Sequence, residues 1–233
     1  MQVYRAASIV VAGGKGSRMG TKVKKQYLDL QGMPILAHTL SVFETAKDIS
    51  HIVLVVPEED IEFCRENIKH KYDFTKISQI VAGGKTRGES VFNGLRKTFQ
   101  EDKLVAVHDG ARPLLNAAVL TKGIAAAGEY GASVVAVRVK DTIKRAGNDN
   151  FVRDTLPREE LWAVQTPQVF KRDLLLKCYR KAFAEGVKGT DDASIVEYYG
   201  HQVKIVEGEY ENIKVTTPED LVLANTILAY QKV

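Results

Sequence analysis

A glycine-rich basic segment near the N-terminus is the part of this sequence whose residue types best suit chemistry. Residues 12–20 read AGGKGSRMG, and the stretch from Gly13 to Leu28 holds five Lys or Arg residues and no Asp or Glu. Glycines let a backbone approach a ligand closely and turn its N–H groups toward it, while lysine and arginine supply positive charge. The segment therefore predicts a loop that binds a phosphate or polyphosphate.

Two standard phosphate-binding motifs do not account for this loop. A P-loop needs Gly, four residues and then Gly-Lys-Ser/Thr, but Gln79 stands where the first glycine would precede Gly84-Lys85-Thr86. A dinucleotide-binding GxGxxG motif counted from Gly14 and Gly16 puts Met19 at the third position, with Gly20 one residue late. The glycines must serve another geometry.

Short apolar runs rich in β-branched residues predict the strands that position this loop. They cover residues 7–12, 51–56, 77–82, 104–108, 132–139 and 203–206. Stretches with helical period lie between them, at residues 34–46, 58–70, 87–100, 116–129, 173–185 and 218–230. This alternation predicts a single-domain, Rossmann-like α/β fold, with a mostly parallel sheet and helices on both faces. The loop leaves the first strand at its carboxyl end, where such sheets bind ligands, and this position favours ligand binding over a merely solvated loop.

Residues from about 138 to 161 interrupt the alternation. Two short alternating segments flank the turn-forming residues 146–150, AGNDN, and this pattern predicts a β-hairpin that protrudes from the sheet. An isolated hairpin is marginally stable in water, so we expect this arm to pack against something else, such as a second subunit.

Composition limits the remaining possibilities. The chain has 233 residues, 45% of them hydrophobic, which suffices for one ordinary core, and we expect one domain over residues 1–233. Cys64 and Cys178 form no CxxC or Cys/His cluster, which argues against zinc or thioredoxin-like chemistry. The apolar run near the N-terminus is too short to span a membrane, so we expect a cytoplasmic protein with no membrane partner.

The net charge of +4 is concentrated in the basic segment. Removing its five cations from 33 Lys and Arg leaves 28, against 29 Asp and Glu, or −1 for the rest of the chain. A balanced surface with one local excess of positive charge fits a single polyanionic ligand, and we expect no nucleic-acid partner.

Further motifs, read together with the glycine-rich loop, carry a family resemblance. In chain order they are Lys25-Gln26-Tyr27-Leu28, Gly83 to Val91 (GGKTRGESV), His108 to Pro113 (HDGARP), Asp141-Thr142-Ile143-Lys144, Leu161-Trp162, Gln165-Thr166-Pro167-Gln168, Thr190 to Ser194 (TDDAS) and Asn212 to Thr216 (NIKVT). The ordered set resembles the sugar-phosphate nucleotidyltransferases, and among them the 2-C-methyl-D-erythritol 4-phosphate cytidylyltransferase family of the non-mevalonate isoprenoid pathway. The resemblance extends from about residue 7 to residue 225.

Two departures keep a second substrate open. The family loop often reads Ala-Ala-Gly where this chain has Ala12-Gly13-Gly14, and it usually has Pro where this chain has Lys24. The Ala-Gly-Gly form also resembles the sister ribitol-5-phosphate cytidylyltransferases. Residues 109–113, DGARP, are nonetheless more similar to the methylerythritol enzymes than to the Asp-Ser-Val-Arg-Pro pattern of the ribitol ones.

The resemblance implies a reaction in which a phosphate oxygen of the substrate attacks the α-phosphorus of CTP and releases pyrophosphate. Catalysis of such a step consists mainly of alignment and stabilisation of negative charge, which requires cations. It implies that Arg18 and Lys25 stabilise the transition state. The implied nucleotide-binding residues are Ala12, Gly13, Gly14, Gly16, Arg18, Lys25, Gly84, Ser90 and Gly110.

The resemblance also implies a set of residues for the polyol phosphate: Asp109, Arg112, Thr142, Arg158, Thr166, Thr190 and Lys214. Mg²⁺ is the expected cofactor, held mainly by triphosphate oxygens and water, with Asp109 as a tentative contact. Three structural alternatives stand beside these roles. Ser90 could be an ordinary helix-start residue, Asp109 could form a salt bridge with Arg112, and His108 is more simply a structural residue than a general base.

The arm carries Thr142 and Arg158, and in the family it exchanges between two subunits. The resemblance therefore implies a homodimer in which each site takes these residues from its neighbour. An interpretation of a different class is a non-catalytic protein that binds nucleotides or nucleic acid through the basic loop.

Overall fold

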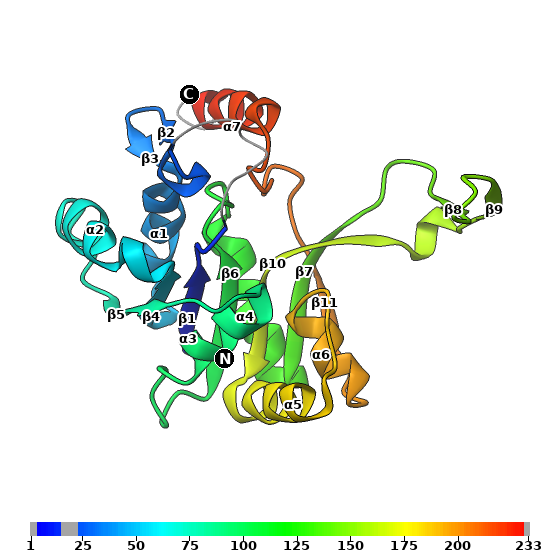
Figure 1. The fold of residues 1–233 in the computed structure, drawn as a ribbon, viewed down its shortest axis with the longest axis horizontal. Coiled ribbons are helices and arrows are strands. Elements are labelled where there is room, and N and C mark those ends of the chain that lie inside the picture. Colours follow the sequence, from blue (N-terminus) through cyan, green and yellow to red (C-terminus); the bar gives the residue numbers. More distant parts are fainter. Residues whose placement is uncertain (1–3, 15–22, 231–233) are drawn as a thin grey trace.

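A seven-stranded sheet forms the centre of the protein in a computed structural model that describes residues 4–14 and 23–230 (Figure 1). Its strands follow the order β11-β7-β10-β6-β1-β4-β5. Only β10 runs antiparallel to its neighbours β6 and β7 within this sheet. The strands are β1 (Ala6–Val11), β4 (Ile49–Val56), β5 (Ile77–Ala82), β6 (Leu104–Asp109), β7 (Ala132–Arg138), β10 (Trp162–Lys171) and β11 (Lys204–Glu207). The predicted, mostly parallel α/β sheet is confirmed.

Helices cover both faces of this sheet because most of its strands are buried on both sides. One face packs against α1 (Ile35–Thr45), α2 (Ile61–Cys64), the π-helix η4 (Arg65–His70) and α4 (Ala117–Tyr130). The other packs against α3 (Arg87–Leu95), α5 (Arg172–Glu185) and α6 (Asp192–Tyr198). Neighbouring residues of β1 show the alternation, since Val10 faces the first core and Ile9 the second.

Strand β10 and helix α6 are absent from the sequence prediction. Polar residues and Pro167 interrupt β10, and its pairing with β7 shifts register between Val164 and Gln168, so no continuous apolar run marks this strand. Helix α6 is only seven residues long, too short to show a helical period, although Asp191 and Ser194 form a capping box at its start.

Helix α3 ends at Leu95, whereas its sequence pattern extends to residue 100. Turns follow the helix, because the N–H groups of Lys97 and Thr98 donate to the carbonyls of Gly94 and Leu95. The hydroxyl of Thr98 also accepts a hydrogen bond from Nε of Arg172, 2.9 Å away, which ties this turn to the start of α5.

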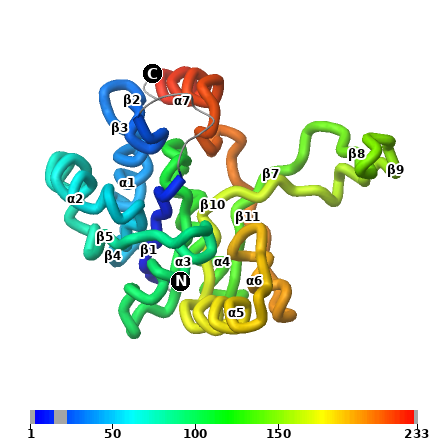
Figure 2. The backbone as a smooth tube through the Cα atoms, viewed as in Figure 1, coloured from blue at the N-terminus to red at the C-terminus, as the bar shows by residue number. Residues whose placement is uncertain are grey.

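The predicted hairpin is present as β8 (Lys144–Ala146) and β9 (Val152–Thr155), which pair with each other and not with the central sheet (Figure 2). Two apolar side chains that follow its polar turn are open to solvent, since Phe151 is 72% exposed and Val152 is 58% exposed. The hairpin is confirmed as an arm, while its exchange between subunits stays a prediction.

A third apolar cluster stands near the carboxyl end of the sheet. It joins the short hairpin β2 (Asp29–Leu30) and β3 (Met33–Pro34) to α7 (Pro218–Tyr230), through Leu30, Val215 and Ala224. This packing holds residues 212–217 beside the segment that follows the glycine-rich loop. Among the helices described, none is long and apolar enough to cross a membrane.

Candidate active site

A pocket of about 550 Å³ opens where β1 and β6 end. Strand β1 stands between β4 and β6, and the chain runs outward from β1 in both directions, which makes this the topological switch point of the sheet. Val11 and Asp109 are paired in register at the ends of the two strands. The described lining is Val11, Ala12, Gly13, Gly14, Lys25, Gln26, Gly84, Lys85, Thr86, Arg87, Ser90, Asp109, Ala111 and Lys214.

The start of the glycine-rich loop is held firmly against the sheet. The N–H of Ala12 donates to the carbonyl of Val55, and the carbonyl of Ala12 accepts from Nε2 of the buried Gln26, 2.9 Å away. Ala12, Gly13 and Gly14 thus line the pocket, and their contact with a nucleotide stays a prediction. Gly16 and Arg18, two further predicted site residues, lie outside the described residues.

Lys25 lines the pocket beside Gly14, where a Cβ atom would lie 3.5 Å from Cε of the lysine. It begins the 3₁₀ helix η2 (Lys25–Tyr27), and its Nζ donates to the carbonyl of Val215, 3.2 Å away. The preceding Lys24 turns elsewhere, because its Nζ lies 2.9 Å from Glu59 Oε1 and 2.7 Å from Asp60 Oδ1. The basic stretch is therefore divided, with Lys25 in the pocket lining and Lys24 paired with carboxylates outside it.

Gly84 and Ser90 come together in the turn that starts α3. The Ser90 hydroxyl accepts from the N–H of Gly84 at 3.0 Å and donates to the carbonyl of Thr86 at 2.9 Å. A Cβ atom at Gly84 would lie 2.3 Å from Cβ of Glu89, so only glycine fits here. Ser90 is thus a residue of the first helical turn that also lines the pocket.

Asp109 is the electrostatic centre of the pocket. Its Oδ1 lies 3.1 Å from Nε of Arg87, and its Oδ2 lies 2.6 Å from Nζ of Lys214. Burial alone would raise the pKa of this carboxyl, but Arg87, Lys214 and Arg112 outweigh it and hold the pKa well below its usual range. Asp109 is therefore an ionised group placed among cations.

The alternative salt bridge between Asp109 and Arg112 is wrong for the described residues. The ion pairs of Asp109 are with Arg87 and Lys214, and Nη1 of Arg112 instead donates to the carbonyl of Asn212, 2.6 Å away. Arg112 follows Asp109 by three residues in a turn, with its N–H on the carbonyl of Asp109, and this geometry directs its side chain toward residues 212–217.

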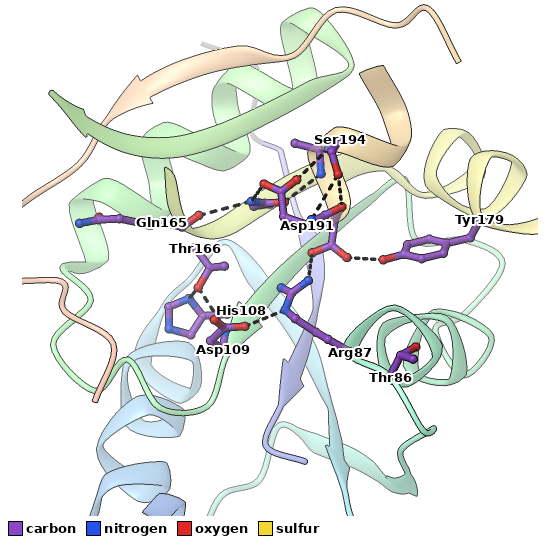
Figure 3. Close-up of polar contacts among 12 residues, drawn as sticks. Thr86, Arg87, His108, Asp109, Gln165, Thr166, Tyr179, Asp191 and Ser194 are labelled. Carbon is purple, nitrogen blue, oxygen red and sulfur yellow. Dashed lines mark hydrogen bonds and ion pairs between the residues drawn. The ribbon is translucent and has the colours of Figure 1, made fainter. Parts of the chain in front are cut away.

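His108 and Thr166 form a hydrogen-bonded chain beneath Asp109. The N–H of Asp109 donates to Oγ1 of Thr166 at 3.1 Å, which leaves the Thr166 hydroxyl to donate to Nδ1 of His108 at 3.0 Å. Nε2 of His108 then donates to the carbonyl of Arg112. Burial lowers the pKa of His108 to about 4, so the ring is neutral and structural. Figure 3 shows Thr166 pointing at both neighbours.

The other predicted residues are spread more widely. Gly110 lies beside the pocket, where its N–H donates to the carbonyl of Val11 and a Cβ atom would meet Cβ of Ala12 at 2.9 Å. Thr190 lines a second pocket of about 340 Å³ between α3, α5 and the 186–191 loop. Thr142 and Arg158 are exposed on the arm and line neither pocket. Within one chain they are not brought to the site.

Sequence reasoning assigned no role to Arg87 or Asn212, although both fall within quoted motifs. Asn212 is buried, and its Nδ2 donates to Oε1 of Gln165 at 3.0 Å and to the carbonyl of Thr166 at 2.9 Å. It therefore locks the segment that carries Lys214 onto β10. An arginine at the start of a helix, where charge opposes the helix dipole, was the signal that could have singled out Arg87.

A metal ion would find one carboxylate in this pocket. The described residues contain no group of three or more His, Cys, Asp or Glu arranged to hold a metal, and both oxygens of Asp109 already face cations. Mg²⁺ needs only one or two carboxylates when it arrives with phosphates, so the residues fit a metal carried in by its nucleotide better than a resident one. The contact between Mg²⁺ and Asp109 stays a prediction.

These features define a nucleotide-binding α/β enzyme of the nucleotidyltransferase class. A glycine turn, Lys25 and the paired Lys214 and Asp109 surround a pocket at the switch point of the sheet. Comparison with known proteins narrows this class to one family. A family model described as 2-C-methyl-D-erythritol 4-phosphate cytidylyltransferase matches residues 6–230, and the chain belongs to this family.

Similar proteins agree over nearly the full length. Proteins of the same name from Clostridium novyi and Alkaliphilus metalliredigens are each 50% identical to this chain, covering 95% and 96% of it and 95% and 93% of their own lengths. The crystal structure of 4-diphosphocytidyl-2C-methyl-D-erythritol synthase from Anaerococcus prevotii superposes with a TM-score of 0.86 at 36% identity, covering 97% of this chain and 96% of its own. The predicted family, fold and enzyme class are confirmed, and neither the ribitol alternative nor the non-catalytic one is favoured.

Proposed function

We propose that this protein transfers the cytidylyl group of CTP to 2-C-methyl-D-erythritol 4-phosphate, forming 4-diphosphocytidyl-2-C-methyl-D-erythritol and pyrophosphate. The observation that carries the proposal is the meeting of Lys25, Lys214 and Asp109 around one pocket at the ends of β1 and β6, in a chain of this family. A phosphate oxygen of the alcohol phosphate attacks the α-phosphorus of CTP, and the bond to the β-phosphate oxygen breaks.

The side chains of the pocket supply positive charge and alignment. Lys25 lines the pocket beside Gly14, where its ammonium can stabilise the charge that develops on the phosphoryl oxygens. Lys214 and Asp109 form a paired donor and acceptor on the β6 side, suited to orient a hydroxylated phosphate ester. The pocket needs no nucleophilic side chain, because the substrate itself carries the attacking oxygen.

Arg18 is the second residue that we propose for transition-state stabilisation, on the strength of the family motif alone. Mg²⁺ is the proposed cofactor; when bound with CTP it would neutralise part of the triphosphate charge, with Asp109 as the nearest carboxylate. The backbone of residues 12–14 and the turn that carries Gly84 and Ser90 are proposed to receive the nucleotide.

The arm makes a homodimer part of the proposal. Thr142 and Arg158 are exposed and line neither of the two pockets described above, which supports their delivery to the site of a neighbouring copy. The exposed apolar side chains of Phe151 and Val152 beside the turn of the arm also favour a partner surface over water. A cytoplasmic location and the lack of nucleic-acid partners stay predictions from the sequence.

Pyrophosphate release tests this function directly. The purified chain is incubated with CTP, Mg²⁺ and either 2-C-methyl-D-erythritol 4-phosphate or ribitol 5-phosphate, and the pyrophosphate formed is measured for each alcohol phosphate. We expect turnover with the methylerythritol substrate and at least about 100-fold lower kcat/KM with ribitol 5-phosphate, because an acceptor with mismatched hydroxyls leaves polar groups of the site unpaired. Turnover with ribitol 5-phosphate alone would overturn the proposal.

A further inference from the structure

Arg87 connects the site to a buried carboxylate at the start of α6. It is the first residue of that helix, and its side chain contacts two carboxylates through two different nitrogens. Nε lies 3.1 Å from Oδ1 of Asp109, and Nη1 lies 2.9 Å from Oδ2 of Asp192. Figure 3 shows Arg87 extending from the start of α3 toward Asp109. One guanidinium therefore joins the end of β6 to the start of α6.

This buried carboxylate is rigid. Asp192 is fully buried, and its second oxygen, Oδ1, accepts a hydrogen bond from the hydroxyl of the buried Tyr179 in α5. Its backbone lies directly after the helix cap formed by Asp191 and Ser194. The Asp192 carboxylate is buried, is hydrogen-bonded at both oxygens and belongs to a capped helix start, so it has one orientation. It therefore fixes the orientation of the guanidinium that binds it.

Of the two cations on Asp109, Arg87 is the one that also binds a fully buried carboxylate. Lys214, the cation on Oδ2, has a side chain that is 38% exposed and carries several freely rotating bonds. The last torsion of an aspartate side chain is broad, so a single flexible partner does not hold its carboxylate in one plane. With Arg87 on Oδ1 and Lys214 on Oδ2, the two oxygens of Asp109 are held by side chains from two different elements, α3 and the 212–217 segment.

We propose that Arg87 is a positioning residue of the cytidylyl transfer. Because its guanidinium is held by Asp192, which Tyr179 holds in turn, it fixes the orientation of the Asp109 carboxylate that faces the alcohol phosphate. This role rests on the proposed function. Arg87 acts through Asp109 and not on the reacting atoms. Lysine is not equivalent to it, because a lysine would have to meet both carboxylates with one nitrogen, whereas Arg87 meets Asp109 and Asp192 with two nitrogens fixed in one plane.

The test is a double-mutant cycle in the full-length protein, measured by pyrophosphate release. Arg87→Gln is expected to raise KM for the alcohol phosphate about tenfold and to lower kcat about tenfold, with less than a threefold change in KM for CTP. Arg87→Lys is expected to restore neither value. In the background of Asp109→Asn, the same Arg87→Gln change is expected to alter kcat/KM less than threefold, because its target carboxylate has been removed.

Two further variants separate positioning from folding. Arg87→Gln combined with Asp192→Asn removes one cation and one anion, so it leaves no unpaired buried carboxylate, and it is expected to unfold within a few degrees of the unaltered protein yet keep the raised KM. Arg96→Gln, which removes an exposed cation from the end of the same helix, is the matched control and should change neither substrate's KM.

The outcomes are distinct. If the double variant Arg87→Gln with Asp109→Asn lowered kcat/KM by the product of the two separate effects, Arg87 would bind a ligand directly. This result would overturn the positioning role. An unchanged KM for the alcohol phosphate in Arg87→Gln with Asp192→Asn would overturn it as well. If the unaltered protein itself released no pyrophosphate, the proposed function would fail, and the role of Arg87 with it.

Discussion

Nζ of Lys214 lies 2.6 Å from Oδ2 of Asp109, and this contact joins the segment after β11 to the end of β6. It depends on a chain of buried contacts. Asn212 holds its segment to Gln165 and Thr166, while the N–H of Val215 donates to the carbonyl of Ala111. The amino group thus reaches the pocket because the backbone on both sides of it is bound to the sheet.

Replacing Lys214 by Met should weaken substrate binding more than stability. Asp109 would keep Arg87 as a partner, and Lys214 is more than a third exposed, so we expect the free energy of unfolding to fall by less than about 1 kcal/mol. KM for the alcohol phosphate should rise at least about tenfold. Urea unfolding and steady-state kinetics measure the two effects, and a larger loss of stability than of binding would contradict this assignment.

Replacing Lys25 by Ala should act on the chemical step. Its side chain lines the pocket and Val215 holds its ammonium there, so removing it should lower kcat about 100- to 1,000-fold, as expected for the loss of one preorganised donor to a developing oxyanion. Lys24→Ala is a matched control, because the neighbouring lysine is paired with Glu59 and Asp60 outside the pocket, and it should change kcat less than threefold. Equal losses of kcat in the two variants would contradict the assignment of Lys25 to the pocket and Lys24 to the carboxylates outside it.

The position of the arm leads us to expect that a change in it affects KM for the alcohol phosphate alone. Arg158→Ala should raise KM for the alcohol phosphate about tenfold while KM for CTP changes little, because the nucleotide turn lies on β1 and α3 and the arm is remote from both. Mixing Arg158→Ala with the inactive Lys25→Ala should restore part of the activity, if each site uses an arm from its neighbour. A fully active monomer would rule out arm exchange.

Burial of neutral His108 predicts a dependence of stability on pH. Its pKa is about 4 in the folded protein and near 6.5 when unfolded, so between these values the unfolded chain binds the extra proton. The contribution is complete above about pH 6.5 and decreases as the pH falls toward 4, by up to about 3 kcal/mol. His108→Gln can keep both hydrogen bonds without titrating, so urea unfolding across this range should show a shallower slope.

The elements that the sequence predicted best are those whose burial is uniform. β1, β4 and β6 are apolar on both faces and appear as unbroken runs, so both their existence and their parallel arrangement followed from the pattern. β10 was missed because Gln165, Thr166 and Gln168 serve the site rather than the core: they hold Asn212, Asp109 and Asp191. Functional polar groups inside a buried strand hide it from any test of hydrophobic periodicity.

By itself, the sequence determined the fold class, the family and the place of a basic glycine turn after the first strand. These depend on local composition and on the order of motifs. The packing of distant segments was needed to show that Asp109 pairs with Arg87 and Lys214, that Lys24 turns away from the pocket, and that the arm lies far from its own site. Such choices depend on which side chains distant segments bring within a few ångströms of each other, and a charged group in a partly buried site takes the nearest partner in space rather than in sequence.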